Sequence, residues 1–207
     1  MTDQPLKGVV VVDFGIHGAV SACGKVLADW GADVIKADSL SGDVCRFSGA
    51  QLNLPTTEDD NIHWEMLNGN KRSIAIDMKT PEGREIMERL LAKANIFFTN
   101  MRMRAIEKFG LDYESMSQRH PHIIWGHLSG FGTDGPQAAD PGFDVVSYRA
   151  RSGLLLDFTE KGSAPNTAPF GVGDLNAGAM LAGGMAACLV VGLLVGGSGW
   201  LPMGEDV

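Results

Sequence analysis

Apolar runs of strand length alternate along this chain with stretches of helical period, and this alternation constrains the fold more than any other feature. Residues 8–14 form a largely apolar run, which is typical of a strand buried on both faces of a parallel sheet. Residues 20–30 carry apolar side chains at helical spacing, Gly31 can end that helix, and residues 33–37 read as the next strand. Further strands are expected over residues 73–78, 95–100 and 122–129. The pattern predicts a doubly wound, mostly parallel α/β sheet of Rossmann-like type, with ligands bound beyond the carboxyl ends of its strands.

The segments between the later strands carry helix signals. Thr80 can cap a helix, because its hydroxyl can accept a hydrogen bond from a free N–H of the first turn. Shorter helices are expected over residues 103–109 and after Asp112, and a longer one over about residues 143–151. Residues 39–70 contain turn signals and are expected to be mostly loop.

The end of the chain contains a long apolar segment. Residues 176–204 include no Asp, Glu, Lys or Arg, and more than about 18 uncharged residues is the length signal of a membrane span. The segment is nevertheless rich in glycine, and residues 177–188 are mostly Ala, Gly and Met, which are only weakly hydrophobic. We expect a buried helix of a soluble protein here, with a membrane span or an aberrant tail as the alternatives.

Composition and missing motifs narrow the functional classes. The net charge of −8 argues against non-specific binding to nucleic acid. Residues 15–20 lack the GxGxxG pattern of a nicotinamide site, and the chain has no GxSxG motif and no metal-like cluster of His or Cys. Residues 1–5 lack the features of a secretory signal, so the expected location is the cytoplasm.

One carboxylate stands near the start of the apolar segment. Asp174 follows Gly173, which has no side chain to shield it, and an acid in the first turn of a helix is held ionised by the free N–H groups there. An open, ionised carboxylate can act as a nucleophile or a base. The alternative is that Asp174 only caps the helix.

Basic residues gather near two of the expected strand ends. They are Lys71, Arg72 and Lys79 in one group and Arg102, Arg104 and Lys108 in the other. Together with a helix N-terminus near Asn100, these groups suit the binding of phosphates. Solvated helix faces are the alternative interpretation.

Six short motifs occur in order along the chain. They lie at residues 31–36 with 42–43, 70–74, 77–83, 129–136, 141–144 and 173–178. Taken together, over about residues 6–189, they resemble the family III CoA-transferases of the CaiB/BaiF type. Residues 99–102, 139–144 and 160–162 are most similar to family members that act on 2-hydroxy acids and their enoyl-CoA counterparts.

The resemblance implies roles for particular residues. The catalytic aspartate of the family falls on Asp174, whose carboxylate would attack an acyl-CoA thioester and pass through a mixed anhydride to an aspartyl-CoA thioester. Gly171 and Gly173 would leave room for these intermediates, and backbone N–H groups would stabilise their oxyanions. The positions that correspond to the coenzyme A site of the family are Ala19, Lys79, Asn100, Arg102 and Lys108. The residues that depart from the family pattern are Gly18, Ser39 and Met101.

The resemblance also implies partners and a larger protein. Members of the family use an acyl-CoA and a small carboxylic acid, need no metal, and are homodimers of chains about twice as long as this one. Residues 1–189 would form the N-terminal portion of such a chain, and residues 190–207 an atypical apolar tail produced by truncation or frame disruption. The expected function is a CoA-transferase, with a non-catalytic CoA- or nucleotide-binding module or an inactive fragment as the alternatives.

Overall fold

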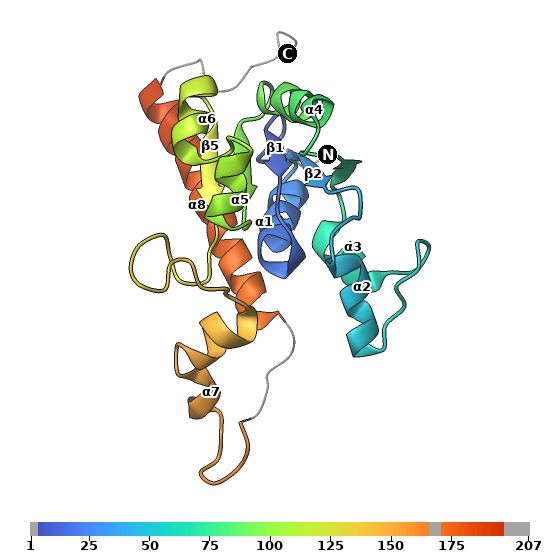
Figure 1. Cartoon of the computed structure of the whole chain (residues 1–207), viewed down its shortest axis with the longest axis vertical. Helices are drawn as coiled ribbons and strands as arrows, with labels where there is room; N and C mark the ends of the chain where they lie inside the picture. The colour runs from blue at the N-terminus through green and yellow to red at the C-terminus, as the bar shows by residue number, and fades with distance from the viewer. Residues whose placement is uncertain (1–3, 166–170, 197–207) are drawn as a thin grey trace.

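A five-stranded sheet forms the centre of the molecule (Figure 1). The computed structural model describes residues 4–165 and 171–196. The strands are β1 (Val10–Asp13), β2 (Asp33–Asp38), β3 (Arg72–Ala75), β4 (Ile96–Thr99) and β5 (Ile124–His127). They lie in the order β3-β2-β1-β4-β5, and every pairing between neighbours is parallel. The carboxyl ends of all five strands therefore lie at one edge of the sheet.

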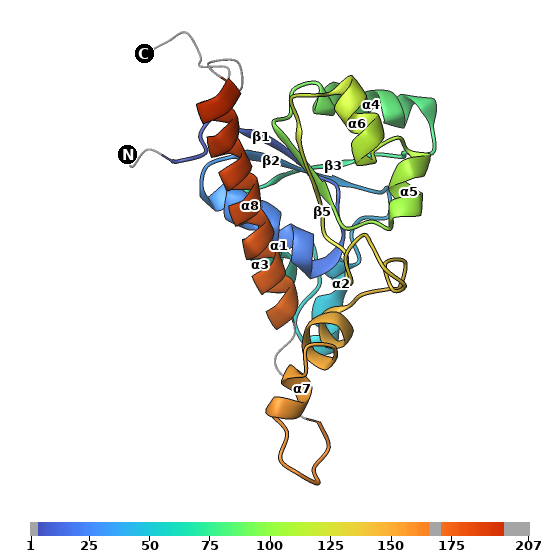
Figure 2. The same ribbon diagram turned by 90° about the vertical axis from the view of Figure 1, so that its left-hand side faces the viewer.

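Helices cover both faces of this sheet (Figure 2). The helices that form the two layers are α1 (His17–Asp29), α4 (Pro81–Leu91), α5 (Met103–Lys108), α6 (Tyr113–Arg119) and α8 (Val172–Gly196). Helices α1 and α8 pack against one face, whereas α4, α5 and α6 pack against the other. The predicted doubly wound α/β architecture is therefore confirmed, with a sheet that is parallel throughout.

A hydrophobic core lies on each face of the sheet, because successive residues of a strand point to opposite faces. Val11 and Phe98 belong to the core beneath α1 and α8, whereas Val12 and Phe97 belong to the core beneath α4, α5 and α6. All four side chains are fully buried. This burial on both faces is why the strands are readable in the sequence as apolar runs.

Helix α8 buries only one of its faces, which corrects the prediction of a buried helix. Ala182, Met185 and Leu189 point into the core, whereas Met180 is 79% exposed and Leu194 is 80% exposed. Among the helices of the described residues, α8 alone is long and apolar enough to cross a membrane, and core helices of soluble proteins also meet that criterion.

The expected division of the chain after residue 189 falls inside α8. The helix continues without a break to Gly196, so the first residues of the expected tail are helical. Residues 197–207, which make up the rest of that tail, lie outside the described residues. The division into residues 1–189 and 190–207 therefore stays a prediction.

The region between β2 and β3 holds more regular structure than predicted. Instead of a loop over residues 39–70, the chain forms α2 (Cys45–Ser48), a 3₁₀ helix η1 (Gly49–Leu52) and α3 (Ile62–Asn68). The N–H of Trp64 donates to the Asn61 side chain (3.1 Å), which caps α3, and Leu67 packs against α1 and α2. A helix this short shows no clear sequence period, and tertiary contact stabilises it.

Beyond β5, the chain leaves the sheet as an arm beyond the carboxyl ends of the strands (Figures 1 and 2). This arm contains a π-helix η2 (Asp144–Ala150), where the sequence predicts an α-helix, and the short helix α7 (Leu154–Asp157). Helix α8 then begins beside η2, so the first turn of α8 lies at the edge where the sequence predicts ligand binding.

Candidate active site

Asp174 lies in the first turn of α8 and faces the first turn of α1. A Cβ atom added to Gly18 would lie 2.7 Å from Oδ2 of Asp174 and 3.4 Å from its Cγ. The carboxylate thus rests directly against the backbone of Gly18, and Asp174 is half-buried. The absence of a side chain at position 18 creates the space that this carboxylate occupies.

The cap of α8 comes from another element, not from Asp174. Oδ1 of Asp144, in η2, accepts hydrogen bonds from the N–H groups of Gly173 (2.5 Å) and Asp174 (3.2 Å). Within the described part of the chain, no hydrogen bond holds the carboxylate of Asp174. The interpretation of Asp174 as a simple helix cap is therefore wrong, because Asp144 performs that task.

Asp144 is held in place by a buried ion pair. Its Oδ2 lies 2.7 Å from the guanidinium of Arg149, and both side chains are almost fully buried. The pair connects the two ends of η2. The contact lacks hydrogen-bond geometry, so the attraction between the two buried charges is what holds the carboxylate that caps α8.

The two glycines before Asp174 serve different purposes in the structure. Gly171 has φ of 79°, a left-handed conformation that favours glycine, and a Cβ there would meet nothing. A Cβ on Gly173 would collide with the ring of Tyr148 and lie 2.5 Å from Oδ1 of Asp144. The N–H of Gly173 is already bonded to Asp144, so its predicted part in an oxyanion hole would need that bond to open.

The electrostatic surroundings raise the pKa of Asp174. Burial raises the pKa of its carboxyl above the ordinary value, and the nearby carboxylate of Asp144 raises it further. His17 and Arg149 oppose this shift without cancelling it. A carboxylate with a raised pKa is more basic, which favours its use as a nucleophile or base once it is ionised.

Buried charges fix the loop that leads into α1. His17 has φ of 63°, and its N–H donates to both oxygens of Asp43, at 3.0 and 3.1 Å. Asp43 in turn lies 3.0 Å from the ammonium group of Lys36, which also donates to the carbonyl of Gly15. Burial would lower the pKa of Lys36, but Asp13 and then Asp43 outweigh burial and raise it. The lysine therefore stays charged and holds the loop.

Two of the predicted CoA-site residues help to shape the same edge. The amide of Asn100 accepts from the N–H of Ile16 (2.9 Å) and donates to its carbonyl (2.8 Å). Asn100 thereby connects the end of β4 to the loop before α1. Ala19 lies where α1 and α8 cross, since a Cβ on Gly178 would collide with the Ala19 carbonyl. Their observed contacts are within the protein, at the edge where Asp174 lies.

Three predicted basic residues remain available in the segments that follow β3 and β4. Lys79 follows β3, Arg102 precedes the first residue of α5, and Lys108 lies in its last turn. All three are exposed, and none of them forms an ion pair with another described residue. They can therefore contact an anionic ligand without first breaking an ion pair.

Two other basic residues do not fit the predicted phosphate site. The ammonium group of Lys71 is buried and lies 2.9 Å from Oδ2 of Asp13. Arg72 pairs with Asp33 at 2.6 Å on the surface. These carboxylates neutralise both side chains, so Lys71 and Arg72 serve the fold. The sequence did not reveal this, because the partners lie 58 and 39 residues away along the chain.

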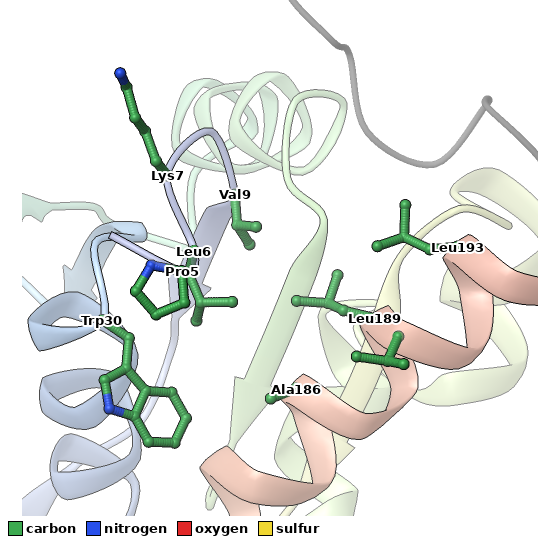
Figure 3. A pocket seen from close by; sticks show the side chains of 9 residues that line it. Pro5, Leu6, Lys7, Val9, Trp30, Ala186, Leu189 and Leu193 are labelled. Carbon is green, nitrogen blue, oxygen red and sulfur yellow. The ribbon is translucent and has the colours of Figure 1, made fainter. Parts of the chain in front are cut away.

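The cavity in Figure 3 lies away from Asp174. It has a volume of about 410 Å³, and its lining includes Leu6 and Trp30 on one side and Ala186, Leu189 and Leu193 of α8 on the other. Ala186 is twelve residues beyond Asp174, or about 18 Å along the helix. The cavity is almost wholly apolar, so it offers no group for the chemistry expected at Asp174.

No group of three or more His, Cys, Asp and Glu side chains within residues 4–165 and 171–196 is arranged to hold a metal ion.

The sequence alone did not identify a role for Asp144, Lys36 or Asp43. Two features of the sequence could have drawn attention to these residues. Lys36 lies within an otherwise apolar strand, and Asp144 lies in one of the six motifs. Neither signal identified a partner.

Comparison with known proteins assigns the chain to a family. Residues 6–199 match the model of CoA-transferase family III. The chain is 41% identical over 184 residues to the (R)-2-hydroxy-4-methylpentanoate CoA-transferase of Clostridioides difficile, a match that covers 89% of this chain and 46% of that protein. It is 37% identical over 183 residues to the cinnamoyl-CoA:phenyllactate CoA-transferase of Clostridium sporogenes, covering 88% and 44%.

The structural comparison agrees. A crystal structure of a CaiB/BaiF family protein from Brucella suis superposes with a TM-score of 0.87 at 31% identity, covering 94% of this chain and 51% of that one. A hypothetical protein from Mycobacterium tuberculosis superposes with a TM-score of 0.79 at 30% identity, covering 93% and 53%. The chain spans about half the length of the curated relatives it matches. It belongs to CoA-transferase family III.

Proposed function

We propose that Asp174 is the nucleophile of a CoA-transferase, which moves CoA from an acyl-CoA to a small carboxylic acid. The observation that carries this proposal is the free carboxylate of Asp174 in the first turn of α8, which rests against Gly18 while Asp144 supplies the helix cap. Membership of CoA-transferase family III supports the same chemistry.

The proposed reaction proceeds through three covalent intermediates on Asp174, namely an anhydride, a thioester and a second anhydride. Its carboxylate attacks the thioester carbonyl, the C–S bond breaks, and a mixed anhydride forms while CoA leaves as a thiolate. The Asp174 carbonyl of that anhydride then accepts the thiolate, which releases the donor acid and leaves an aspartyl-CoA thioester. Attack by the acceptor carboxylate on this thioester gives a second anhydride and free thiolate. The thiolate finally takes the acceptor acyl group, and the carboxylate of Asp174 is restored.

The chain offers a consistent set of groups to hold CoA at this edge. In the proposal, the exposed side chains of Lys79, Arg102 and Lys108 contact the phosphates of CoA. The loop held by Asn100 and the start of α1 at Ala19 border the thioester. The proposed chemistry uses no metal.

The relatives suggest the substrate class. Two of them are named for (R)-2-hydroxy-4-methylpentanoate and for cinnamoyl-CoA with phenyllactate. We infer that the acceptor is a 2-hydroxy acid and that the donor is an enoyl-CoA, in the cytoplasm. The exposed apolar residues of α8 and the arm, among them Met180, Leu156 and Phe158, would be covered in a homodimer of a longer protein.

Trapping of the acyl-enzyme tests the proposal. The chain is incubated with cinnamoyl-CoA and hydroxylamine, digested, and examined by mass spectrometry for a hydroxamate on Asp174. We expect the modification in the wild type, none in Asp174→Asn, and full modification in Asp157→Asn, a matched change of an exposed acid in α7. A wild type that binds CoA by calorimetry yet never carries the hydroxamate would be a CoA-binding module, which is the second candidate function.

A further inference from the structure

The start of α8 has an unusual division of tasks between two aspartates. A helix leaves free N–H groups in its first turn, and an acid within that turn commonly bonds to one of them. Asp174 is such an acid, yet the N–H groups of Gly173 and Asp174 itself are bonded to Asp144, which lies 30 residues earlier in η2. The carboxylate of Asp174 lies instead against Gly18.

We propose that Asp144 is a positioning residue: by capping α8 from outside, it frees the carboxylate of Asp174 from helix capping and presents it to the substrate. This inference deepens the proposed function and rests on it for its catalytic meaning. The positioning itself is a property of the folded chain and can be measured without turnover.

The placement of Asp144 makes this role specific. Its Oδ1 accepts hydrogen bonds from both N–H groups, and its Oδ2 lies 2.7 Å from Arg149 in a buried ion pair that lacks hydrogen-bond geometry. Tyr148, in the same helix η2, lies so close to Gly173 that no larger residue would fit there. The arm thus contacts the first turn of α8 through the carboxylate of Asp144 and the ring of Tyr148.

Asp144 and Arg149 also contribute to the electrostatic surroundings of Asp174, together with His17 of α1. The carboxylate of Asp144 opposes ionisation of Asp174, and Arg149 favours it, although burial is the larger influence on the pKa of Asp174. Removal of the Asp144 charge should therefore lower the pKa of Asp174, and removal of the Arg149 charge should raise it. These opposite shifts report the two charges, whereas hydrogen exchange at the amides of Gly173 and Asp174 reports the cap that Asp144 provides.

The experiment is an NMR titration of the Asp174 side-chain carboxyl in the full chain, with amide hydrogen exchange at Gly173 and Asp174. In Asp144→Asn, a side-chain oxygen still caps the helix, so we expect protected amides and a lower Asp174 pKa. In Arg149→Met, the pKa should rise. In Asp144→Ala, both amides should exchange about fivefold faster or more. Asp157→Asn, in α7, should change neither readout.

The rate of hydroxamate formation on Asp174 then measures how far the cap from Asp144 affects the reaction. We expect Asp144→Ala to slow it by about tenfold or more and Asp144→Asn to retain most of it. Unchanged exchange in Asp144→Ala, or pKa shifts of the same sign in Asp144→Asn and Arg149→Met, would overturn the inference. If Asp144→Ala does not fold, the other two variants still decide it. If the titration behaves as expected but the wild type forms no hydroxamate, the proposed function fails while the positioning stands.

Discussion

Gly18 and Asp174, 156 residues apart in the sequence, are in direct contact across the crossing of α1 and α8. The contact brings a carboxylate to the carboxyl edge of a parallel sheet, where α/β proteins commonly bind their ligands. A side chain at position 18 would occupy the space of the Asp174 carboxylate, so this glycine determines where the proposed nucleophile can lie.

Replacement of Gly18 by alanine should therefore lower the reactivity of Asp174 while leaving the stability of the fold almost unchanged. The added Cβ would lie 2.7 Å from Oδ2 of Asp174, and the short aspartate side chain would have to turn away. We expect hydroxamate formation on Asp174 to slow by about tenfold to a hundredfold. The free energy of unfolding should change by less than about 1 kcal/mol, since alanine also favours the helix. A rate equal to that of the wild type would contradict the proposed position of the nucleophile.

Gly184→Ala is the matched control for this experiment. The position is exposed in the middle of α8, and an added Cβ there would meet nothing within 4 Å. Hydroxamate formation should be unchanged, and the free energy of unfolding should rise by up to about 1 kcal/mol.

Gly178 should be far less tolerant of the same change, because it lies where α1 and α8 cross. A Cβ on Gly178 would collide with the Ala19 carbonyl and lie 2.7 Å from Cβ of Ala22 and 2.9 Å from the N atom of Cys23. Backbone atoms of α1 cannot move aside without moving the helix. We expect Gly178→Ala to lower the free energy of unfolding by about 1–3 kcal/mol, measured by urea denaturation. Gly183→Ala, which is open to solvent, should not lower it.

The strands could be predicted from the sequence because they are buried on both faces of the sheet. Val11 and Val12 point into different cores, so β1 is apolar at successive positions and is readable without its neighbours. Helix α3 was missed, because Leu67 is buried only by contact with α1 and α2. The exposed face of α8 was missed as well, because its composition does not distinguish Met180 from Met185.

The candidate site was predictable only in part. Local pattern and family resemblance both pointed to Asp174, and the structure puts it in the predicted first turn of a helix. Its cap, Asp144, was not predictable, because a hydrogen bond across 30 residues leaves no local pattern. The ion pair between Lys71 and Asp13 was not predictable either, because the fold brings together two residues that are 58 positions apart.

Lys36 should be essential to the loop that leads into α1. Its ammonium group is buried beside three carboxylates, at 3.0 Å from Asp43, 3.4 Å from Asp38 and 3.8 Å from Asp13. Lys36→Met would leave the buried Asp43 without its ion-pair partner, while Asp13 keeps Lys71 and Asp38 keeps Arg46. We expect a loss of about 3–5 kcal/mol in the free energy of unfolding. Urea denaturation checks this expectation. Lys25→Met, which removes only an exposed helical pair with Asp29, should cost less than about 1 kcal/mol. Equal losses in the two variants would contradict the role given to Lys36.

The raised pKa of Asp174 should appear in the pH dependence of stability. Because burial and Asp144 raise this pKa above the ordinary value of 3.8, the folded chain binds more protons than the unfolded chain in the window just above that value. The contribution of Asp174 is therefore fully present below the ordinary pKa and is lost as pH rises through the raised one. Asp174→Asn removes this titration. We expect the stability of the variant, relative to the wild type, to increase as pH rises through that window and then to level off.

Urea denaturation at a series of pH values measures this difference for Asp174→Asn. Gly184→Ala serves as the control, since it adds and removes no titratable group, and its difference from the wild type should be the same at every pH. A difference for Asp174→Asn that falls as pH rises would mean that the folded chain lowers the pKa of Asp174. The carboxylate would then be stabilised by the first turn of α8, as a capping residue is, and would not be the free nucleophile that the contact with Gly18 and the external cap of Asp144 indicate.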